Sequence, residues 1–297
     1  FGPCDEFFAA GRAAGLPLKE VHIYGSLAMV TDIAFGYELG EEQQTLATQH
    51  GKSYGEILKS VWGAVQKHAE QKQWPILSYC RCDEPRVLEQ AQRVLAMMKL
   101  CRENAPWLRI GGYYSVNWTL NDPLHTAIQD MFKTLVWSGL NEHHQVDYDK
   151  AKEFGREIHI YNQGKGRYSF GAYQWAEMRK GAKGRSEWHL NAVSGYQFFD
   201  LDGREPDIGY LRWGSKGIIP NLDYHRAREG IDDFKWAVTL WNAAGRAGAA
   251  GEDAKKWLQG IADAIPAGQR TAAKTWMGDD AFRAECMKRL RALGGKK

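Results

Sequence analysis

The segment Pro75-Ile-Leu-Ser-Tyr-Cys-Arg-Cys-Asp-Glu-Pro85 indicates both the fold class and the candidate site. Its first part is a short apolar run typical of a buried strand, and a helical pattern follows Pro85. Asp83 and Glu84 therefore lie at a switch from strand to helix, where α/β enzymes commonly carry catalytic groups. Two adjacent carboxylates at such a place can divide the roles of general acid and general base.

The same residues also fit an ordinary helix start. Asp83 would then accept hydrogen bonds from backbone N–H groups of the first turn, and Pro85 would occupy the first helical position at no cost. Neighbouring side chains of a regular strand point to opposite faces, so both acids can reach one ligand only if the strand end is bulged or turns. Taken alone, the tripeptide favours the helix start, and the surrounding organisation favours catalysis.

Apolar runs rich in strand-forming residues alternate with helical patterns, which predicts a parallel sheet covered by helices. The expected strands are Val21–Gly25, Ile76–Cys82, Arg109–Val116, Leu135–Gly139, Glu157–Asn162 and Trp188–Val193. The expected helices between them are Tyr54–Lys72, Arg86–Asn104, Pro123–Lys133, Asp149–Gly155 and Tyr168–Gly181. In the helix over 54–72, the stripe expected to face the core is Ile57, Val61, Ala64, Val65 and Ala69.

Beyond Asp223 the patterns are almost wholly helical, with helices expected at Tyr224–Ala244, Asp253–Ala264 and Asp280–Leu293. This predicts a barrel domain over 1–222 and a helical extension over 223–297 packed on it. The segment Ser26–Lys52 is too long for an ordinary loop between a strand and its helix, and we expect it to cover the substrate.

Composition excludes several classes of protein. A chain of 297 residues, 44% hydrophobic and 25% charged, can bury one large core, and its net charge of +3 is spread in a way that does not support nucleic-acid or membrane binding. No apolar stretch reaches the ~18 residues of a membrane span, and no signal segment is visible. The five cysteines lack Cys-x-x-Cys spacing, so they are expected to be mostly free and buried. Phosphate-binding and serine-hydrolase motifs do not occur, and no cofactor is expected.

Two stretches resemble one family. The segment from Asn221 to Trp236, with its Arg-Glu-Gly-Ile-Asp-Asp-Phe core, is similar to the helix that follows the barrel in glycoside hydrolase family 123 and related domains of unknown function. Asp-Glu-Pro at the strand end is the second match, and the resemblance covers Ile76 to Leu240 in outline. It implies a (β/α)8 TIM-like barrel with the acid pair after the fourth strand, and hydrolysis of terminal β-N-acetylhexosaminides. In that register the first two strands would lie upstream of Phe1, leaving a barrel that is incomplete or closed by another piece.

The resemblance also implies a mechanism. Retaining glycosidases commonly use a second carboxylate about 5 Å from the acid, often on strand seven. The corresponding segment Ile158-His-Ile-Tyr-Asn-Gln-Gly164 offers none. Enzymes with adjacent Asp and Glu do without it, because the substrate's 2-acetamido oxygen attacks and forms an oxazolinium ion. Glu84 would protonate the departing oxygen and Asp83 would accept the acetamido N–H, with the close like charge helping Glu84 to keep its proton.

Other strand ends supply candidate substrate-binding residues. Aromatic rings there would stack on the apolar face of a sugar, and Asn or Arg would bind its hydroxyls. We expect Tyr161 to orient the acetamido carbonyl. The full set is Tyr113, Tyr114, Trp137, Asn141, Tyr161, Asn162, Arg167, Trp188 and Asn191.

Other polar clusters are interpreted as structural. Glu142-His143-His144 lacks the spacing of zinc helices, and the loop with Asp200, Asp202 and Asp207 departs from calcium-loop spacing, so no metal is expected. In the family-like helix, Arg228 and Asp232 are spaced for an i, i+4 ion pair.

Two alternatives remain open. A barrel hydrolase with separated carboxylates would use Glu84 as acid and Glu142 or Asp200 as nucleophile or base. A non-catalytic carbohydrate-binding or assembly module would bind glycans without cleaving them. The expected partner is a glycan or glycoconjugate, a substrate class that favours a secreted or periplasmic location, while the sequence leaves the oligomeric state undetermined.

Overall fold

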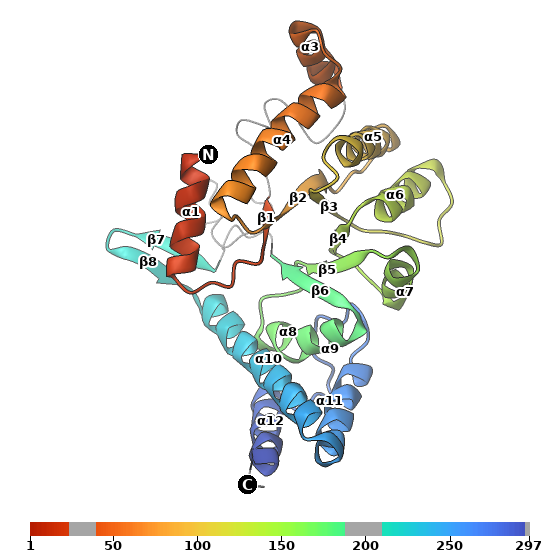
Figure 1. Ribbon diagram of the computed structural model, residues 1–297. Coiled ribbons are helices and arrows are strands. Elements are labelled where there is room, and N and C mark those ends of the chain that lie inside the picture. The colour runs from red at the N-terminus through yellow and green to blue at the C-terminus, as the bar shows by residue number, and fades with distance from the viewer. Residues whose placement is uncertain (24–39, 188–209, 295–297) are drawn as a thin grey trace. The chain divides into compact units, whose positions relative to one another are not determined.

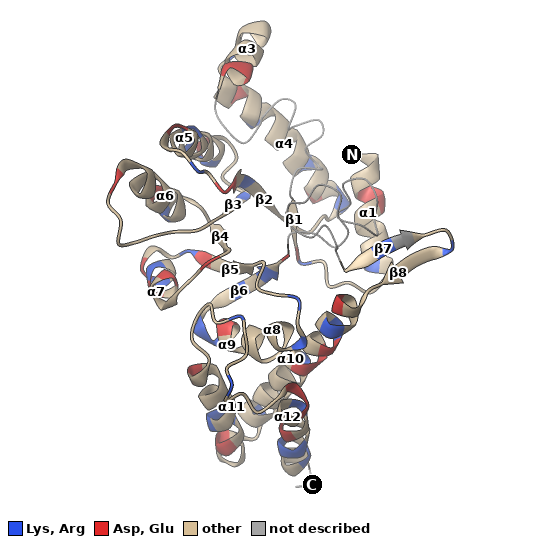
Figure 2. Cartoon of the chain, turned by 180° about the vertical axis from the view of Figure 1, so that it is seen from behind, with Lys and Arg blue, Asp and Glu red and all other residues tan. Residues whose placement is uncertain are grey.

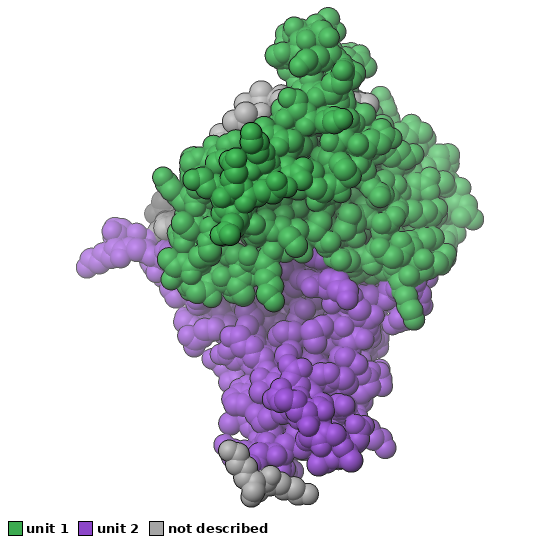
Figure 3. All heavy atoms as spheres, viewed as in Figure 1, with its two compact units in different colours: residues 1–140, 150–158 green, residues 141–149, 159–297 purple. Residues whose placement is uncertain are grey.

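The computed structural model describes residues 1–23, 40–187 and 210–294. The chain divides into two compact units, coloured separately in Figure 3. Unit 1 comprises Phe1–Leu140 and Lys150–Ile158, and unit 2 comprises Asn141–Asp149 and His159–Lys297. The chain on both sides of residue 222 belongs to unit 2. None of the described helices has the length and hydropathy that a membrane span requires.

Among the described residues, the main sheet has six strands that lie in the order of the chain (Figure 1). They are β1 (Glu20–Ile23), β2 (Ile76–Asp83), β3 (Arg109–Tyr114), β4 (Trp137–Leu140), β5 (Glu157–Tyr161) and β6 (Ala182–Ser186). The pairs β1–β2, β2–β3 and β3–β4 are all parallel. This confirms an α/β fold with a helical C-terminal region, in a strand order that suits a half-barrel and is compatible with a TIM-like barrel.

The sheet contains one strand that the sequence did not predict. β6 is Ala182–Ser186, whereas Trp188–Val193, which had been expected to form it, lies outside the described residues. The sequence of β6, Ala-Lys-Gly-Arg-Ser, contains no apolar run, so the signal used to find the other five strands is missing. Pairing along the sheet makes this segment a strand.

Unit 1 carries most of the helices that alternate with strands. They are α1 (Gly2–Ala13), α3 (Glu41–His50), α4 (Tyr54–Lys72), α5 (Leu88–Asn104) and α6 (Pro123–Thr134), while α7 (Gln145–Phe154) belongs partly to each unit. α3 lies inside the segment expected to be a covering loop, whose residues 26–39 lie outside the described residues. The last part of that segment is therefore a helix of ten residues with Gly40 as its N-cap.

The bounds of α4 were predicted correctly, but the side that it buries was not. Ser53 caps it by accepting a hydrogen bond from the Glu56 N–H, while the Glu56 carboxylate accepts one from the Ser53 N–H. The side chains that are buried are Tyr54, Leu58, Trp62 and Val65, so the expected stripe was rotated by about one residue. The bulky ring of Trp62 packs edge-on against Tyr79 of β2 and decides which face is turned inward.

Unit 2 is built around one long helix. Its elements are α8 (Arg167–Phe170), α9 (Ala172–Lys180), the antiparallel hairpin β7 (Leu211–Gly214) and β8 (Gly217–Pro220), α10 (Leu222–Arg246), the short 3-10 turn η2 (Gly248–Gly251), α11 (Glu252–Ala264) and α12 (Asp279–Gly294). α10 packs against α8, α9, α11 and α12. Acidic and basic residues are interspersed along α10, α11 and α12 in Figure 2, as is usual for helices with a solvated face.

Close contact between α8 and α10 explains two glycines. The helix expected over Tyr168–Gly181 breaks at Gly171, which separates α8 from α9. Facing it, a Cβ on Gly230 of α10 would lie 2.3 Å from the Arg167 carbonyl oxygen. The glycine of the Arg-Glu-Gly-Ile motif is therefore required by the close approach of the two backbones.

All five cysteines are free of disulfide bonds. Cys4 is partly exposed and the other four are buried, which confirms the prediction.

Candidate functional site

The acid pair lies at a bulge at the carboxyl end of β2. Cys80 is paired with Gly111 and Asp83 with Tyr113, so β2 contains one more residue than β3 across this stretch. Glu84 follows with a left-handed backbone (φ 42°), and its N–H donates to the Tyr113 carbonyl at 2.8 Å. A bulge and a turn interrupt the strict alternation of side chains. The condition under which adjacent acids can address one ligand is thus met.

The alternative role as a helix start is excluded by where α5 begins. α5 starts at Leu88 with Val87 as its N-cap, and no side chain caps it. Asp83 is therefore not an N-cap, and Pro85 is not the first helical residue as expected from sequence. The Glu84 carboxylate lies 3.5 Å from the guanidinium of Arg86, a strongly exposed partner that contributes little to stability. Helix capping thus gives no reason for an Asp-Glu pair at this position.

Of the aromatic candidates in unit 1, Tyr113 lies beside the acid pair, opposite Asp83 in the strand register. Trp137 is fully buried and packs edge-on against Tyr113, with ring centroids 5.5 Å apart. Tyr114 is buried as well, and its hydroxyl is 2.6 Å from the Ser138 hydroxyl. Trp137 and Tyr114 therefore pack in the core, and Tyr113 is buried as well, so the expected stacking of these rings on a sugar stays a prediction.

The candidates in unit 2 at the ends of β4 and β5 are held by backbone contacts. The amide of Gln163 donates to the carbonyls of Asn141, at 2.5 Å, and Tyr161, at 2.6 Å. Asn162 has a left-handed backbone (φ 53°), and Arg270 donates to its carbonyl oxygen. Tyr161 is buried. No described contact tests its expected role toward an acetamido group, and that role stays a prediction.

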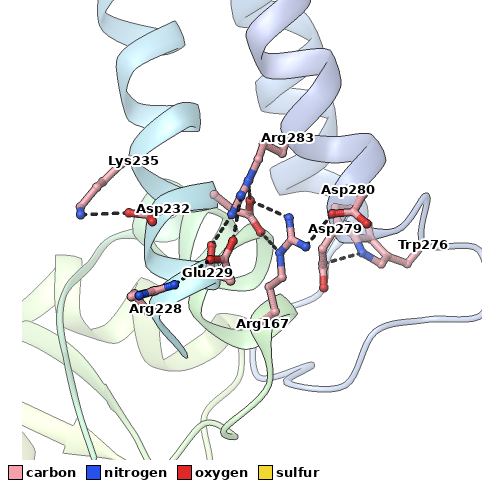
Figure 4. Close-up of polar contacts among 10 residues, drawn as sticks. Arg167, Arg228, Glu229, Asp232, Lys235, Trp276, Asp279, Asp280 and Arg283 are labelled. Carbon is pink, nitrogen blue, oxygen red and sulfur yellow. Dashed lines mark hydrogen bonds and ion pairs between the residues drawn. The ribbon is translucent and has the colours of Figure 1, made fainter. Parts of the chain in front are cut away.

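Arg167 was expected to bind substrate, but its described contacts are structural (Figure 4). Its guanidinium donates to Asp233 on α10 at 2.6 Å and to Asp280 on α12 at 2.6 Å. Arg283 of α12 also donates to Asp233 and, at 2.9 Å, to Glu229. Hydrogen bonding to Asp233 raises the pKa of Arg167 further above its ordinary value. This cluster ties α8, α10 and α12 together.

The family-like helix therefore has a structural role in this cluster. Glu229 and Asp233 supply carboxylates and Gly230 allows close approach, so three positions of the motif serve helix packing. The expected pair of Arg228 with Asp232 gives way to shorter-range pairs, in which Arg228 contacts Glu229 and Asp232 contacts Lys235 (Figure 4).

A buried polar network in unit 2 was missed by sequence reasoning. His143 was considered only as a metal ligand, yet its Nε2 lies 2.8 Å from the Glu177 carboxylate. The hydroxyl of Tyr148 donates to the same carboxylate, and Tyr173 donates to Gln163 at 3.0 Å. Through Gln163 the network supports the ends of β4 and β5. The signal available in the sequence was Glu177, a single acid among the apolar residues that α9 buries. Among residues 1–23, 40–187 and 210–294, no group of three or more His, Cys, Asp or Glu side chains is arranged to hold a metal ion.

A partly buried carboxylate, Glu187, was also missed, because the sequence placed it before the expected strand Trp188–Val193 and not after a strand. It directly follows β6, and Arg185 donates to it at 2.7 Å. Burial raises the pKa of Glu187, although Arg185 opposes this effect. The candidates Trp188 and Asn191, and the acidic loop with Asp200, Asp202 and Asp207, lie outside the described residues.

Comparison with known proteins adds no assignment. No family model matches the chain, and no curated protein matches it significantly. The function must therefore be argued from the geometry of the residues themselves.

Proposed function

We propose that the protein is a retaining glycoside hydrolase that cleaves terminal β-N-acetylhexosaminides, with β-linked N-acetylgalactosamine as the sugar. The observation that carries the proposal is the bulged end of β2, where Asp83 and Glu84 adjoin Tyr113 at the carboxyl end of a parallel strand without capping a helix. Active sites of barrel enzymes are built at this end of the strands. The proposal includes a complete (β/α)8 barrel, of which the six-stranded sheet would be part.

The proposed chemistry is substrate-assisted. Glu84 gives its proton to the glycosidic oxygen as the C1–O bond breaks, and the acetamido carbonyl oxygen of the substrate forms a bond to C1. Asp83 accepts the acetamido N–H and stabilises the positive charge that develops on the oxazolinium ring. Water then attacks C1, Glu84 takes up the proton, and the ring opens with net retention of configuration.

The absence of a carboxylate at the end of β5 supports this scheme over a two-carboxylate one. Tyr161, Asn162 and Gln163 occupy that position, and the Gln163 side chain is engaged by backbone carbonyls. Of the two partners considered in the alternative scheme, Glu142 is exposed on the loop after β4, and Asp200 lies outside the described residues. A thiazoline mimic of the oxazolinium ion should therefore inhibit the enzyme, whereas trapping by a 2-fluoro sugar would favour the two-carboxylate alternative.

The decisive experiment is a panel of 4-nitrophenyl β-glycosides with and without a 2-acetamido group. We expect cleavage of the acetamido sugars only, and a loss of roughly 10²–10⁴-fold in kcat for Glu84→Gln because the general acid is removed. Glu89→Gln is the matched control, since Glu89 is a strongly exposed carboxylate on α5 paired with Arg93. Equal cleavage of plain galactosides, an active Glu84→Gln enzyme, or glycan binding without any turnover would refute the proposal.

A further inference from the structure

Three residues other than glycine have a left-handed backbone among residues 1–23, 40–187 and 210–294, namely Gln73, Glu84 and Asn162. Gln73 is the C-cap of α4, where this conformation is ordinary. Glu84 and Asn162 instead directly follow the last residues of β2 and β5, two strands of the same sheet. Left-handed residues other than glycine cost free energy and are concentrated at functional sites. Asn162 therefore shares its place after a strand and its strained backbone with the proposed general acid.

The backbone around Asn162 is held on both sides. Its N–H donates to the Ser186 carbonyl at 3.2 Å, and its own carbonyl accepts from the guanidinium of Arg270 at 3.3 Å. The preceding carbonyl, that of Tyr161, accepts from the side-chain amide of Gln163 at 2.6 Å. The Asn162 side chain itself is partly exposed. Because a glycine would adopt this turn without strain, the side chain at this position indicates a use for its carboxamide.

The amide of Gln163 can take only one orientation. Its Nε2 donates one hydrogen to the Asn141 carbonyl and the other to the Tyr161 carbonyl, at 2.5 and 2.6 Å. Its Oε1 accepts from the Tyr173 hydroxyl at 3.0 Å. Gln163 is 1% exposed and Tyr173 is fully buried. Since each end of the amide is fixed by a partner of the opposite kind, Gln163 joins the ends of β4 and β5 in one arrangement.

Tyr173 is in turn held by the buried network on α9. Its hydroxyl lies 3.4 Å from Nε2 of His143, and the same nitrogen lies 2.8 Å from the Glu177 carboxylate. The other oxygen of that carboxylate accepts from the Gly268 N–H at 3.2 Å. Buried polar networks of this kind make their surroundings rigid. The support of the Asn162 turn therefore extends from α9 to the loop between α11 and α12, and all of it belongs to unit 2.

We propose that Gln163 and Tyr173 are positioning residues, which hold the Asn162 carboxamide so that it hydrogen-bonds a hydroxyl group of the bound N-acetylhexosamine. This inference rests on the proposed function, because it places the sugar at the carboxyl ends of the strands. A carboxamide suits a sugar hydroxyl, since it can both donate and accept. Gln163 and Tyr173 act through Asn162 without touching the sugar, as their burial requires.

The test is a double-mutant cycle on the KM for 4-nitrophenyl N-acetyl-β-galactosaminide. Asn162→Gly removes the carboxamide and relieves the left-handed strain. We expect its KM to rise about tenfold, the effect of one hydrogen bond, with kcat within about twofold of the wild type and no fall in melting temperature. Tyr173→Phe should raise KM about threefold, because Gln163 loses the hydroxyl that orients it. In the double variant Tyr173→Phe should add nothing, since no carboxamide remains to be positioned.

Two control variants match these substitutions. Gln73→Gly replaces a residue with the same φ of 53° at the end of a helix, so it should leave KM unchanged. Tyr168→Phe removes a phenol hydroxyl from α8 in the same unit and should also leave KM unchanged.

An unchanged KM in either single variant, or an effect of Tyr173→Phe that persists in the double variant, would overturn the inference. Circular dichroism and thermal melting check the fold of each variant, and Asn162→Gly decides the question by itself should Tyr173→Phe unfold. If the wild-type chain cleaves no acetamido glycoside, the proposed function fails as well. Normal turnover by the wild type without coupling between the two positions refutes only the positioning role.

Discussion

Replacement of Asp233 by Asn tests whether the ion cluster holds the helices of unit 2 together. Asp233 is 1% exposed and accepts hydrogen bonds from both Arg167 and Arg283. Breaking a buried ion pair by removing one partner costs ~3–5 kcal/mol. Because Arg167 keeps Asp280 and Arg283 keeps Glu229, the lower end applies, and we expect the free energy of unfolding to fall by about 3 kcal/mol.

The matched control is the neighbouring Asp232→Asn. The Asp232 side chain is 44% exposed and pairs with Lys235 on the same helix, so its loss should cost below about 0.5 kcal/mol. Urea unfolding followed by far-ultraviolet circular dichroism measures both variants. The same comparison in high salt should abolish the small effect at Asp232 and preserve most of the large one at Asp233. If the two variants differ by less than ~1 kcal/mol, burial does not set the strength of this cluster and the reasoning fails.

Two further stability predictions concern Glu20 and a pair of helix glycines. Burial acts to raise the pKa of Glu20, but hydrogen bonds from Ser78 and Arg109 outweigh it and hold the pKa below its ordinary value of 4.5. Glu20 therefore stabilises the fold above that pH, and this contribution is lost as the pH falls through the lowered pKa. In urea unfolding, Glu20→Gln should lower the free energy of unfolding by ~1 kcal/mol at neutral pH, and the difference from the wild type should vanish in acid. A loss that does not depend on pH would contradict this. Gly230→Ala should destabilise the protein by ~2 kcal/mol or more, because the new methyl group would overlap the Arg167 carbonyl. Gly63→Ala in α4 has open space around it and should stabilise the protein by ~0.5–1 kcal/mol. Thermal melting measures both variants, and equal shifts would refute the packing argument.

Periodicity identified most elements but not their faces. Five of the six strands were found from apolar runs, and α4 was found with its observed bounds, because hydrophobic spacing and capping residues act locally. The polar strand β6 was missed because only its neighbours in the sheet make it a strand. Which face of α4 is buried depended on where the Trp62 ring fits, and a stripe of similar apolar residues cannot specify this.

The candidate site was predicted to a similar extent. Asp83 and Glu84 were singled out from their place after an apolar run, but the bulge and the later start of α5 are what remove the helix-cap alternative. Arg167 could not be recognised as structural from sequence, since Asp233 and Asp280 are distant along the chain. Side chains such as Trp137 are typical of both cores and sugar sites, and only their burial distinguishes the two roles.

The sequence by itself determined the alternation of strands and helices, the adjacency of the two acids, and the small residue at position 230. These depend on local patterning and on covalent neighbours. Tertiary structure alone decided that β2 is bulged at the acids and that Arg167 is neutralised by two other helices. Each of these results from contacts between residues far apart in the chain, whose energies depend on distance and burial in three dimensions.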